Sequence, residues 1–419
     1  MAGCGLLPAR WIPFMFVCFP AKNETLADGR GFVSVRPGIL MTKKHNRPVC
    51  NRVQPVLAPA RWMESCANTE CSLHQLAPYI GKIKSSIAGE LVERYSKPGD
   101  VVADPFAGGG TIPLEAALRG RRAFGADISP YAGILSRAKL LPPRSLDAAL
   151  DLAERALQEA AELPAPDLRK VPAWVRSFFH PATLRETLSF AAVCRRPSNE
   201  FLMACLLGIL HHQRPGFLSY PSSHLVPYLR DRKYPRKRFP EMYAYRELRP
   251  RFLAKIHRSY KRFIEPLPTA VVGFEGSPVQ QLALPGRIGA LITSPPYMNA
   301  LDYGRDNRLR LWFIEPGLVD TVDNDVTQRR QAFIDAMTSL AEKVELALRP
   351  QGYCVFVVGE EVRRSFDAHP SDAVIAIMAQ RARSLRLTDV LIDKIPDVRR
   401  TRRQCRGVKT EHVLIFQRN

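Results

Sequence analysis

The chain has 419 residues, of which 46% are hydrophobic and 24% are charged, a globular composition that excludes a disordered or fibrous protein. Its length allows two domains and a sizeable core. The net charge of +21 and the pI near 9.9 favour a polyanionic partner, because solubility alone rarely needs so one-sided a balance.

Residues 1–62 show no sustained hydrophobic period, and we interpret them as a poorly ordered leader or a mis-called start, with Met41 or Met63 as the initiator. The apolar run Trp11–Pro20 is too short to span a bilayer. It also lacks the basic start and small-residue cleavage site of a signal peptide. The nine cysteines have neither zinc-site nor disulfide-framework spacing, so we expect no metal and a reducing cytoplasm.

Regular alternation of elements begins after this leader. Residues 80–95 have helical apolar spacing, and Val101–Ala103 is an apolar run typical of a buried strand. A helix over about 111–119, a strand over Ala123–Asp127 and a helix over 130–139 are predicted next. This order is typical of βαβ units and hence of a parallel sheet.

Residues 141–265 interrupt the alternation. Leu146–Leu163 is predicted as an amphipathic helix, Phe201–His212 as a buried helix, and Pro215–Pro250 as a basic, proline-dotted segment. Further elements are predicted afterwards: strands at 270–274, 290–293 and 352–358, a helix at 331–348, and a terminal antiparallel strand pair at 388–392 and 412–416. The simplest interpretation is one α/β domain, formed by 63–140 and 266–419, with 141–265 as a helical, basic insertion.

The positive charge is concentrated in two runs. Between Tyr228 and Arg262 there are thirteen Lys and Arg against three acidic residues, with aromatic residues interleaved. Arg399–Arg406 contains no acidic residue. A single run would normally be a solvated helix face, but two runs in a basic chain favour nucleic-acid contact. The residues predicted to bind nucleic acid are Arg230, Arg232, Lys233, Arg236, Lys237, Arg238, Arg402 and Arg403.

The segment Asp104–Thr111 (DPFAGGGT) follows the first predicted strand. Its consecutive glycines let the backbone approach a ligand and take positive φ values. Asp127 ends the next strand, where a doubly wound fold places the carboxylate that binds a ribose hydroxyl pair. An acidic loop start repels a pyrophosphate but suits the cationic amino group of S-adenosylmethionine. The predicted cofactor residues here are Asp104, Pro105, Phe106, Gly108, Gly110, Thr111 and Asp127.

The segment Ser294–Tyr297 (SPPY) follows the predicted strand at 290–293. An exocyclic base amine is a poor nucleophile because its lone pair is delocalised into the ring. The Ser294 side chain and the Pro295 carbonyl can accept hydrogen bonds from the N–H groups of this amine. These bonds stabilise the positive charge that grows on the nitrogen. Pro295 and Pro296 hold the turn rigid, and Tyr297 offers a face for stacking a flipped base. These four residues are the predicted catalytic group.

Together, DPFAGGGT and SPPY resemble the cofactor and catalytic motifs of the amino-group DNA methyltransferases, which methylate cytosine N4 or adenine N6. The resemblance implies a Rossmann-like, seven-stranded, mostly parallel sheet and S-adenosylmethionine as cofactor. It implies double-stranded DNA as partner and leaves open a cognate restriction nuclease. It also adds Ser277 beside the cofactor adenine, and His74, ahead of the first strand, at the methionine end of the cofactor. The insertion 141–265 is then the candidate target-recognition region.

Three alternatives stay open. Ser294 favours cytosine N4, whereas Asp or Asn at this position is usual for adenine N6 methylation. An RNA guanosine N2-methyltransferase has the same motif order but normally carries an RNA-binding domain ahead of the catalytic half. A nucleic-acid-binding protein with a retired fold is the third alternative, against which the intact motifs argue.

Other chemistries are disfavoured. His211, His212 and His224 lack further ligands at helical spacing, so no metal site is expected. Ser219–Ser223 lacks the flanking glycines of a nucleophile elbow, which disfavours a hydrolase. Cytosine C5 methylation needs a Pro-Cys nucleophile where this chain has Pro295-Pro296.

Overall fold

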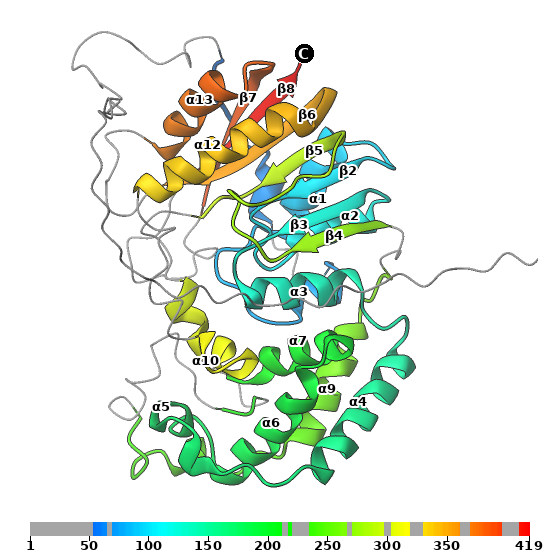
Figure 1. Ribbon diagram of the computed structural model, residues 1–419, viewed down its shortest axis with the longest axis vertical. Helices are drawn as coiled ribbons and strands as arrows, with labels where there is room; N and C mark the ends of the chain where they lie inside the picture. The colour runs from blue at the N-terminus through cyan, green and yellow to red at the C-terminus, as the bar shows by residue number, and fades with distance from the viewer. Residues whose placement is uncertain are drawn as a thin grey trace, which may run out of the picture. The chain divides into compact units, whose positions relative to one another are not determined.

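The computed structural model describes residues 53–64, 69–211, 217–219, 234–265, 270–296, 303–318, 330–360, 369–395 and 410–419 (Figure 1). Several predictions concern residues outside these ranges, and they stay predictions. They are residues 1–52 of the leader, Tyr297 of the catalytic group, and the basic residues Arg230, Arg232, Lys233, Arg402 and Arg403.

The described strands form one eight-stranded sheet with the order β1-β7-β8-β6-β5-β2-β3-β4. Strand β8 is antiparallel to both of its neighbours, and the other pairs are parallel. The strands are β1 (Val56–Leu57), β2 (Val101–Asp104), β3 (Arg122–Ala126), β4 (Val271–Glu275), β5 (Ile288–Thr293), β6 (Leu348–Gly359), β7 (Leu385–Lys394) and β8 (Thr410–Arg418). The predicted Rossmann-like, mostly parallel α/β sheet and its closing antiparallel pair are confirmed.

The sheet has one strand more than the seven that were predicted. Strand β1 pairs in parallel with β7, and the Trp62 side chain that follows it is buried and donates a hydrogen bond of 2.7 Å to Glu90. This corrects the predicted leader, because residues 53–62 belong to the sheet domain. A strand of two residues is too short to give a hydrophobic period, which is why the sequence pattern did not reveal it.

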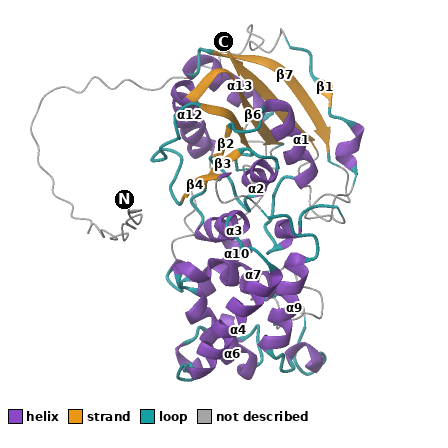
Figure 2. Ribbon diagram, turned by 90° about the vertical axis from the view of Figure 1, so that its right-hand side faces the viewer, coloured by secondary structure: helices purple, strands orange, loops and turns teal. Residues whose placement is uncertain are grey.

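Helices cover both faces of the sheet (Figure 2). On one face, α1 (Ser85–Tyr95) and α2 (Thr111–Leu118) share a core with Ala290, Ile292 and the side chains of β6 and β8 that point the same way. On the other face, α12 (Arg330–Ala347) and α13 (Pro370–Arg381) pack on Leu291 and its neighbours. Strand β5 is buried at all six positions, as expected for a central strand covered on both faces.

The sheet changes direction between β2 and β5. The chain runs from β2 to β3 and β4 on one side, and then returns to place β5 on the other side of β2. In an open α/β sheet, ligands bind at such a switch point, outside the carboxyl ends of the strands. DPFAGGGT follows β2 and SPPY follows β5, so the fold brings the two motifs to that point.

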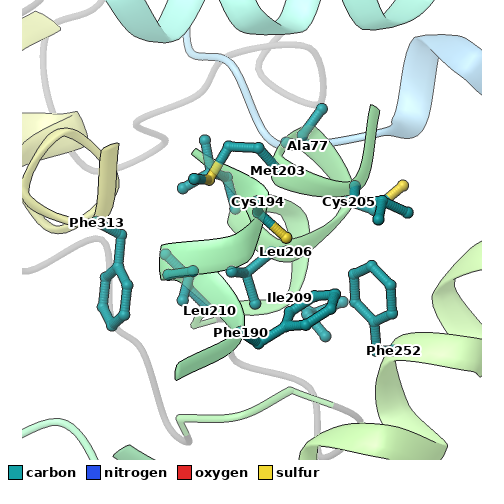
Figure 3. Packing of buried hydrophobic residues seen from close by; sticks show 14 of the residues in the cluster. Ala77, Phe190, Cys194, Met203, Cys205, Leu206, Ile209, Leu210, Phe252 and Phe313 are labelled. Carbon is teal, nitrogen blue, oxygen red and sulfur yellow. The ribbon is translucent and has the colours of Figure 1, made fainter. Parts of the chain in front are cut away.

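Residues 141–265 contain the predicted helical insertion. Its described helices are α4 (Leu146–Glu162), α5 (Ala173–Arg176), α6 (Pro181–Cys194), α7 (Glu200–Ile209) and α9 (Leu248–Tyr260). Short 3-10 helices also occur in the chain, at Ala60–Met63, Ser72–Gln75, Leu168–Lys170, Pro197–Asn199 and Pro240–Tyr243. Helix α7 is buried from Phe201 to Ile209, which matches its apolar sequence. Figure 3 shows its side chains packed between Phe190, Phe252 and Phe313.

The core of this helical lobe extends past the predicted insertion. It takes in α3 (Pro130–Leu140), which precedes it in sequence, and α10 (Tyr303–Ile314), which follows the catalytic motif. In α10, Arg310 donates from Nε to the Leu207 carbonyl oxygen at 3.2 Å. The helix after SPPY is therefore part of the lobe rather than of the layers that cover the sheet.

Candidate active site

A cavity of about 660 Å³ lies at the carboxyl ends of β2 and β5. A volume in the range of roughly 300–1,000 Å³ is typical of sites for small molecules and cofactors. The predicted residues that line it are Asp104, Pro105, Phe106, Gly108, Thr111, Asp127, Ser277, Ser294 and Pro296. Both motifs therefore contribute to one cavity, as their positions after neighbouring strands led us to expect.

The glycine loop has the backbone geometry that its sequence indicated. Gly108 and Gly110 have φ values of 50° and 69°, and Gly110 is the residue that precedes the first turn of α2. A Cβ atom at Gly110 would lie 2.6 Å from the Ser136 hydroxyl oxygen, so the residue needs to be glycine on steric grounds as well. Gly110 does not line the cavity, and its role in the loop is to make this close approach to α3 possible.

Helix α3 holds the glycine loop through two side chains. Ser136 donates to the Gly108 carbonyl oxygen at 3.3 Å, and the Lys139 ammonium donates to the Gly109 carbonyl oxygen. Lys139 is buried, and burial lowers its pKa to about 7. The conformation of the loop thus depends on an uncommon buried lysine.

Asp104 ends β2, and its side chain is 2% exposed. It accepts hydrogen bonds from the Thr293 hydroxyl at 2.6 Å and from the Phe106 backbone N–H at 3.2 Å. Burial raises the pKa of Asp104 to about 7, although both hydrogen bonds act in the opposite direction. A buried carboxylate of this kind is stabilised by a cation placed in the cavity.

Asp127 follows β3 and is held by the backbone. Its Oδ2 atom accepts from the Gly108 N–H and its Oδ1 atom accepts from the Ser129 N–H, both at 2.8 Å. Each carboxylate oxygen can accept a second hydrogen bond. Asp127 is therefore oriented to accept a pair of hydroxyl groups from a ligand in the cavity.

Thr111 gives a further indication of a ligand. Thr111 lines the cavity, and its Oγ1 atom is buried without a hydrogen-bond partner among the described residues. A buried hydroxyl without a partner costs free energy, so a polar ligand group at this position would be favourable. The hydroxyl stands at the N-terminus of α2, where the helix dipole favours a negatively charged group such as a carboxylate.

The SPPY motif lies beside the glycine loop, because β5 pairs directly with β2. Ser294 donates from Oγ to the Val357 carbonyl oxygen at 3.2 Å, which directs its proton towards β6. A hydroxyl that donates in this way can still accept hydrogen bonds through its lone pairs. Pro295 is buried behind the cavity, whereas Pro296 lines it. Ser294, whose hydroxyl can act as an acceptor, therefore lines the same cavity as the glycine loop.

His74 lies away from the cavity. Its ring is buried and its Nε2 atom lies 2.5 Å from Glu115 Oε1 on α2. Burial lowers the pKa of His74, against the effect of the Glu115 carboxylate. In this structure, Tyr79 and Lys82 from the same segment line the cavity instead. His74 is therefore placed to support α2 rather than to touch a ligand.

Several lining residues were absent from the sequence analysis. They lie on α10, on α12 and just beyond α10: Gly304, Leu311, Leu318, Ala332, Asp335 and Ala336. These residues belong to no motif, and they approach the cavity because the two helices pack beside it. Asp335 is the one ionisable residue among these six. Its spacing of one helical turn from Ala332 puts both residues on the same face of α12, but this spacing alone does not predict a binding site.

The three predicted nucleic-acid-binding residues that the structure describes lie at the surface. Arg236, Lys237 and Arg238 form an exposed turn, in which the Arg236 guanidinium lies 5.1 Å from the centre of the Tyr243 ring. Within the described ranges, no helix is long and apolar enough to cross a membrane. The described part of the chain also contains no cluster of three or more His, Cys, Asp or Glu residues that could hold a metal ion.

Comparison with known proteins bears on the cofactor half of this site. A family model described as DNA methylase matches residues 77–134, the segment that contains the glycine loop and Asp127. The Type II methyltransferase M.MjaII of Methanocaldococcus jannaschii is 32% identical over 68 residues. The aligned segment spans 16% of this chain and 13% of that enzyme.

Two of the solved structures that match this chain have low sequence identity and low TM-scores. TrmN from Thermus thermophilus is 11% identical, with a TM-score of 0.29 over 83% of this chain and 52% of that chain. A putative rRNA-methylase from Clostridium thermocellum is also 11% identical, with a TM-score of 0.34 over 81% of this chain and all of that chain. The fold class itself follows from the strand order described above.

Proposed function

We propose, on the premise that this chain is a member of the amino-group DNA methyltransferase family, that it transfers a methyl group from S-adenosylmethionine to an exocyclic amine of a base flipped out of DNA. Cytosine N4 is the favoured target. The observation that carries the proposal is that DPFAGGGT and SPPY line the same cavity. Thr293, the residue before SPPY, also donates a hydrogen bond to Asp104, the first residue of DPFAGGGT.

The residues of the cavity fit S-adenosylmethionine. Asp127 would accept the ribose hydroxyls, and Ser277, which also lines the cavity, would lie beside the adenine. Asp104 would face the cationic part of the cofactor, which suits a buried carboxylate that lacks a cation. Thr111 would donate to the cofactor carboxylate at the N-terminus of α2, giving its hydroxyl a partner.

The cofactor supplies an electrophilic methyl group, and the protein has to make the amine a better nucleophile. Ser294 Oγ and the Pro295 carbonyl would accept the amine N–H groups and localise the nitrogen lone pair. The rigid Pro295-Pro296 turn would hold both acceptors in place. A strong base is not needed before transfer, because the methylated nitrogen is acidic enough to lose its proton afterwards.

The helical lobe is the candidate for target recognition. Helix α10 follows SPPY directly and is packed into the lobe core, so DNA bound by the lobe would be close to the catalytic turn. The exposed Arg236–Arg238 turn belongs to this surface in the proposal. The described cysteines are buried free thiols, which supports the cytoplasm as the compartment.

The test is to incubate the purified protein with duplex DNA and labelled S-adenosylmethionine, digest the DNA and identify the modified nucleoside. We expect N4-methylcytosine. Finding only N6-methyladenine would overturn the base assignment, and transfer to RNA alone would overturn DNA as the substrate. A parallel titration of the cofactor by calorimetry tests whether the chain is instead a nucleic-acid-binding protein with a retired methyltransferase fold. Failure to bind S-adenosylmethionine would exclude an active enzyme.

A Ser294→Ala variant connects this test to the site. We expect it to bind S-adenosylmethionine like the wild type and to lose at least about 90% of its turnover, because one acceptor of the amine is removed. A Ser371→Ala variant is a matched control, since Ser371 is buried on α13 and does not line the cavity. Equal turnover in the wild type and Ser294→Ala would remove Ser294 from the mechanism.

A further inference from the structure

A second cavity, of about 320 Å³, lies beside the first one. Its walls come from the segment 72–78, the end of α7 and one face of α9, and Figure 1 shows α7 and α9 side by side. Lys82 lines both cavities. The ionisable side chains among the described lining residues are Lys82, Lys255 and Arg258, all of them basic.

Close contacts between the three walls build this cavity. Gly208 on α7 has no room for a side chain, because a Cβ atom there would collide with the Leu76 carbonyl oxygen. Lys255 donates from Nζ to the Gln75 carbonyl oxygen at 2.7 Å, and Lys82 donates from Nζ to the His74 carbonyl oxygen at 2.8 Å. Lys255 and Lys82 are thus bonded to the 72–78 backbone, and of the three cations Lys255 is buried while Lys82 and Arg258 are exposed.

The ionisable side chains that line the cavity are all basic, and one acidic neighbour, Glu70, interacts with Lys82. Lys255 is 7% exposed, and burial lowers its pKa to about 8, with Arg258 and Lys82 acting in the same direction. The nearby Glu70 accepts hydrogen bonds from Gln75 and Ser85, and it does not line the cavity. An anion in the cavity would offset the repulsion between these cations and the cost of burying Lys255.

We propose that this cavity is a binding site for a phosphate group, held by Lys82, Lys255 and Arg258. An ammonium group has three N–H donors, so a lysine that holds one carbonyl can also bind an anion. The Arg258 guanidinium can bind two phosphate oxygens at once. The bound phosphate is either a phosphodiester of the DNA backbone or free inorganic phosphate. Only the first of these two sources rests on the proposed function.

The first experiment measures phosphate alone on the full chain. Inorganic phosphate is titrated into the wild type, Lys255→Met and Arg258→Gln, with binding followed by calorimetry. We expect the wild type to bind, and each variant to bind at least roughly tenfold more weakly, which corresponds to the removal of one charged hydrogen bond. Arg258 is exposed, so its substitution leaves the fold intact even where Lys255→Met destabilises the protein. Arg155→Gln, an exposed charge on α4, is the matched control and should bind like the wild type.

The second experiment separates the sources. Duplex DNA binding is measured at several salt concentrations for the wild type, Arg258→Gln and Arg155→Gln. A salt slope that falls by about 0.9 only in Arg258→Gln assigns the site to a backbone phosphate. An unchanged slope, together with phosphate binding in the first experiment, assigns it to free phosphate.

The outcomes of the two experiments test this proposal separately from methyl transfer. Absence of phosphate binding by the wild type, with the same DNA salt slope in all three proteins, overturns the phosphate site. Equal weakening in Arg155→Gln also overturns it, because the effect would then follow net charge alone. Absence of any methylated nucleoside would overturn the proposed function and leave the phosphate titration unaffected.

Discussion

Thr293 donates a hydrogen bond of 2.6 Å to Asp104, although 189 positions separate the two residues in the chain. Thr293 is the last residue of β5 and Asp104 is the last residue of β2, and both side chains are buried. This bond links the residue before SPPY to the first residue of the glycine loop. The bond therefore couples the position of the SPPY turn to the side chain of Asp104.

Loss of this bond should weaken cofactor binding. Thr293→Val keeps the shape of the side chain but removes the donor, which raises the pKa of Asp104 further and leaves less of the carboxylate to meet a cation. We expect S-adenosylmethionine to bind about tenfold more weakly, as for the loss of a hydrogen bond to a charged group. Calorimetry measures this, and Thr293→Ser should restore most of the affinity. An unchanged Kd in Thr293→Val would contradict the coupling.

Asp104 should also make stability depend on pH. Its pKa is raised from 3.8 to about 7, so between these values the native state holds a proton that the unfolded chain has released. Stability contributed by this group therefore falls as the pH rises from about 4 to 7. Asp104→Asn should stabilise the ligand-free protein by about 1–3 kcal/mol at pH 8 and by little at pH 4, while it weakens cofactor binding. Thermal unfolding at the two pH values measures the difference, and equal effects at both would contradict it.

Two glycines with nearly the same φ allow a matched test of the loop. Gly110→Ala introduces backbone strain and a clash with Ser136, whereas Gly120→Ala introduces strain where no atom lies within 4 Å. We expect Gly120→Ala to cost about 1–2 kcal/mol of stability without affecting cofactor binding. Gly110→Ala should cost more and also reduce cofactor affinity. The free energy of unfolding is measured with denaturant and the cofactor affinity by calorimetry. If the two variants lose equal amounts of both, the contact with Ser136 has no role.

Arg195 ties the lobe to the helix that follows the catalytic motif. Its guanidinium donates to the carbonyl oxygens of Ile314 at 2.9 Å and Phe313 at 3.1 Å, at the end of α10. Arg195→Ala should lower turnover roughly fivefold, by the loss of about 1 kcal/mol of positioning, with little change in cofactor Kd. The neighbouring Arg196→Ala, which removes an exposed pair with Glu159, is the control. If Arg195→Ala lowers the affinity for the cofactor but leaves turnover unchanged, the prediction is wrong.

The exposed basic turn should contribute to DNA binding through charge. Arg236→Ala or Lys237→Ala should weaken binding and lower the salt slope by about 0.9 for each DNA phosphate that is no longer neutralised. Arg386→Ala, an exposed arginine on β7, is the matched control. The measurement is the affinity for duplex DNA at several salt concentrations, and a slope unchanged by the first two variants would remove this turn from the interface.

Much of the sheet could be predicted from local sequence. Strands such as β5 are uninterrupted apolar runs, and the glycine loop and SPPY mark where two of them end. Parallel strands bring their carboxyl ends to one edge, so a shared cavity for Asp104 and Ser294 followed from the order of elements alone.

Features that depend on tertiary packing could not be predicted in this way. The contact of His74 with Glu115, the burial of Lys139 beneath Gly109 and the place of α10 in the lobe core all join segments distant in sequence. Histidine and lysine are polar residues that sequence patterns assign to surfaces or ligands by default. Strand β1 has two residues, which is fewer than any periodic pattern needs.

The insertion of residues 141–265 between β3 and β4 has a consequence for the order of events in folding. The pairing of Val102 with Ala290 closes a chain segment that contains the whole insertion, and such long-range closure is slow. The insertion is helical, and helices form through local contacts, so we expect its helices to form before the two strands meet. The cavity would then be the last part of the molecule to form, and a newly synthesised chain would acquire its cofactor only after the lobe is complete.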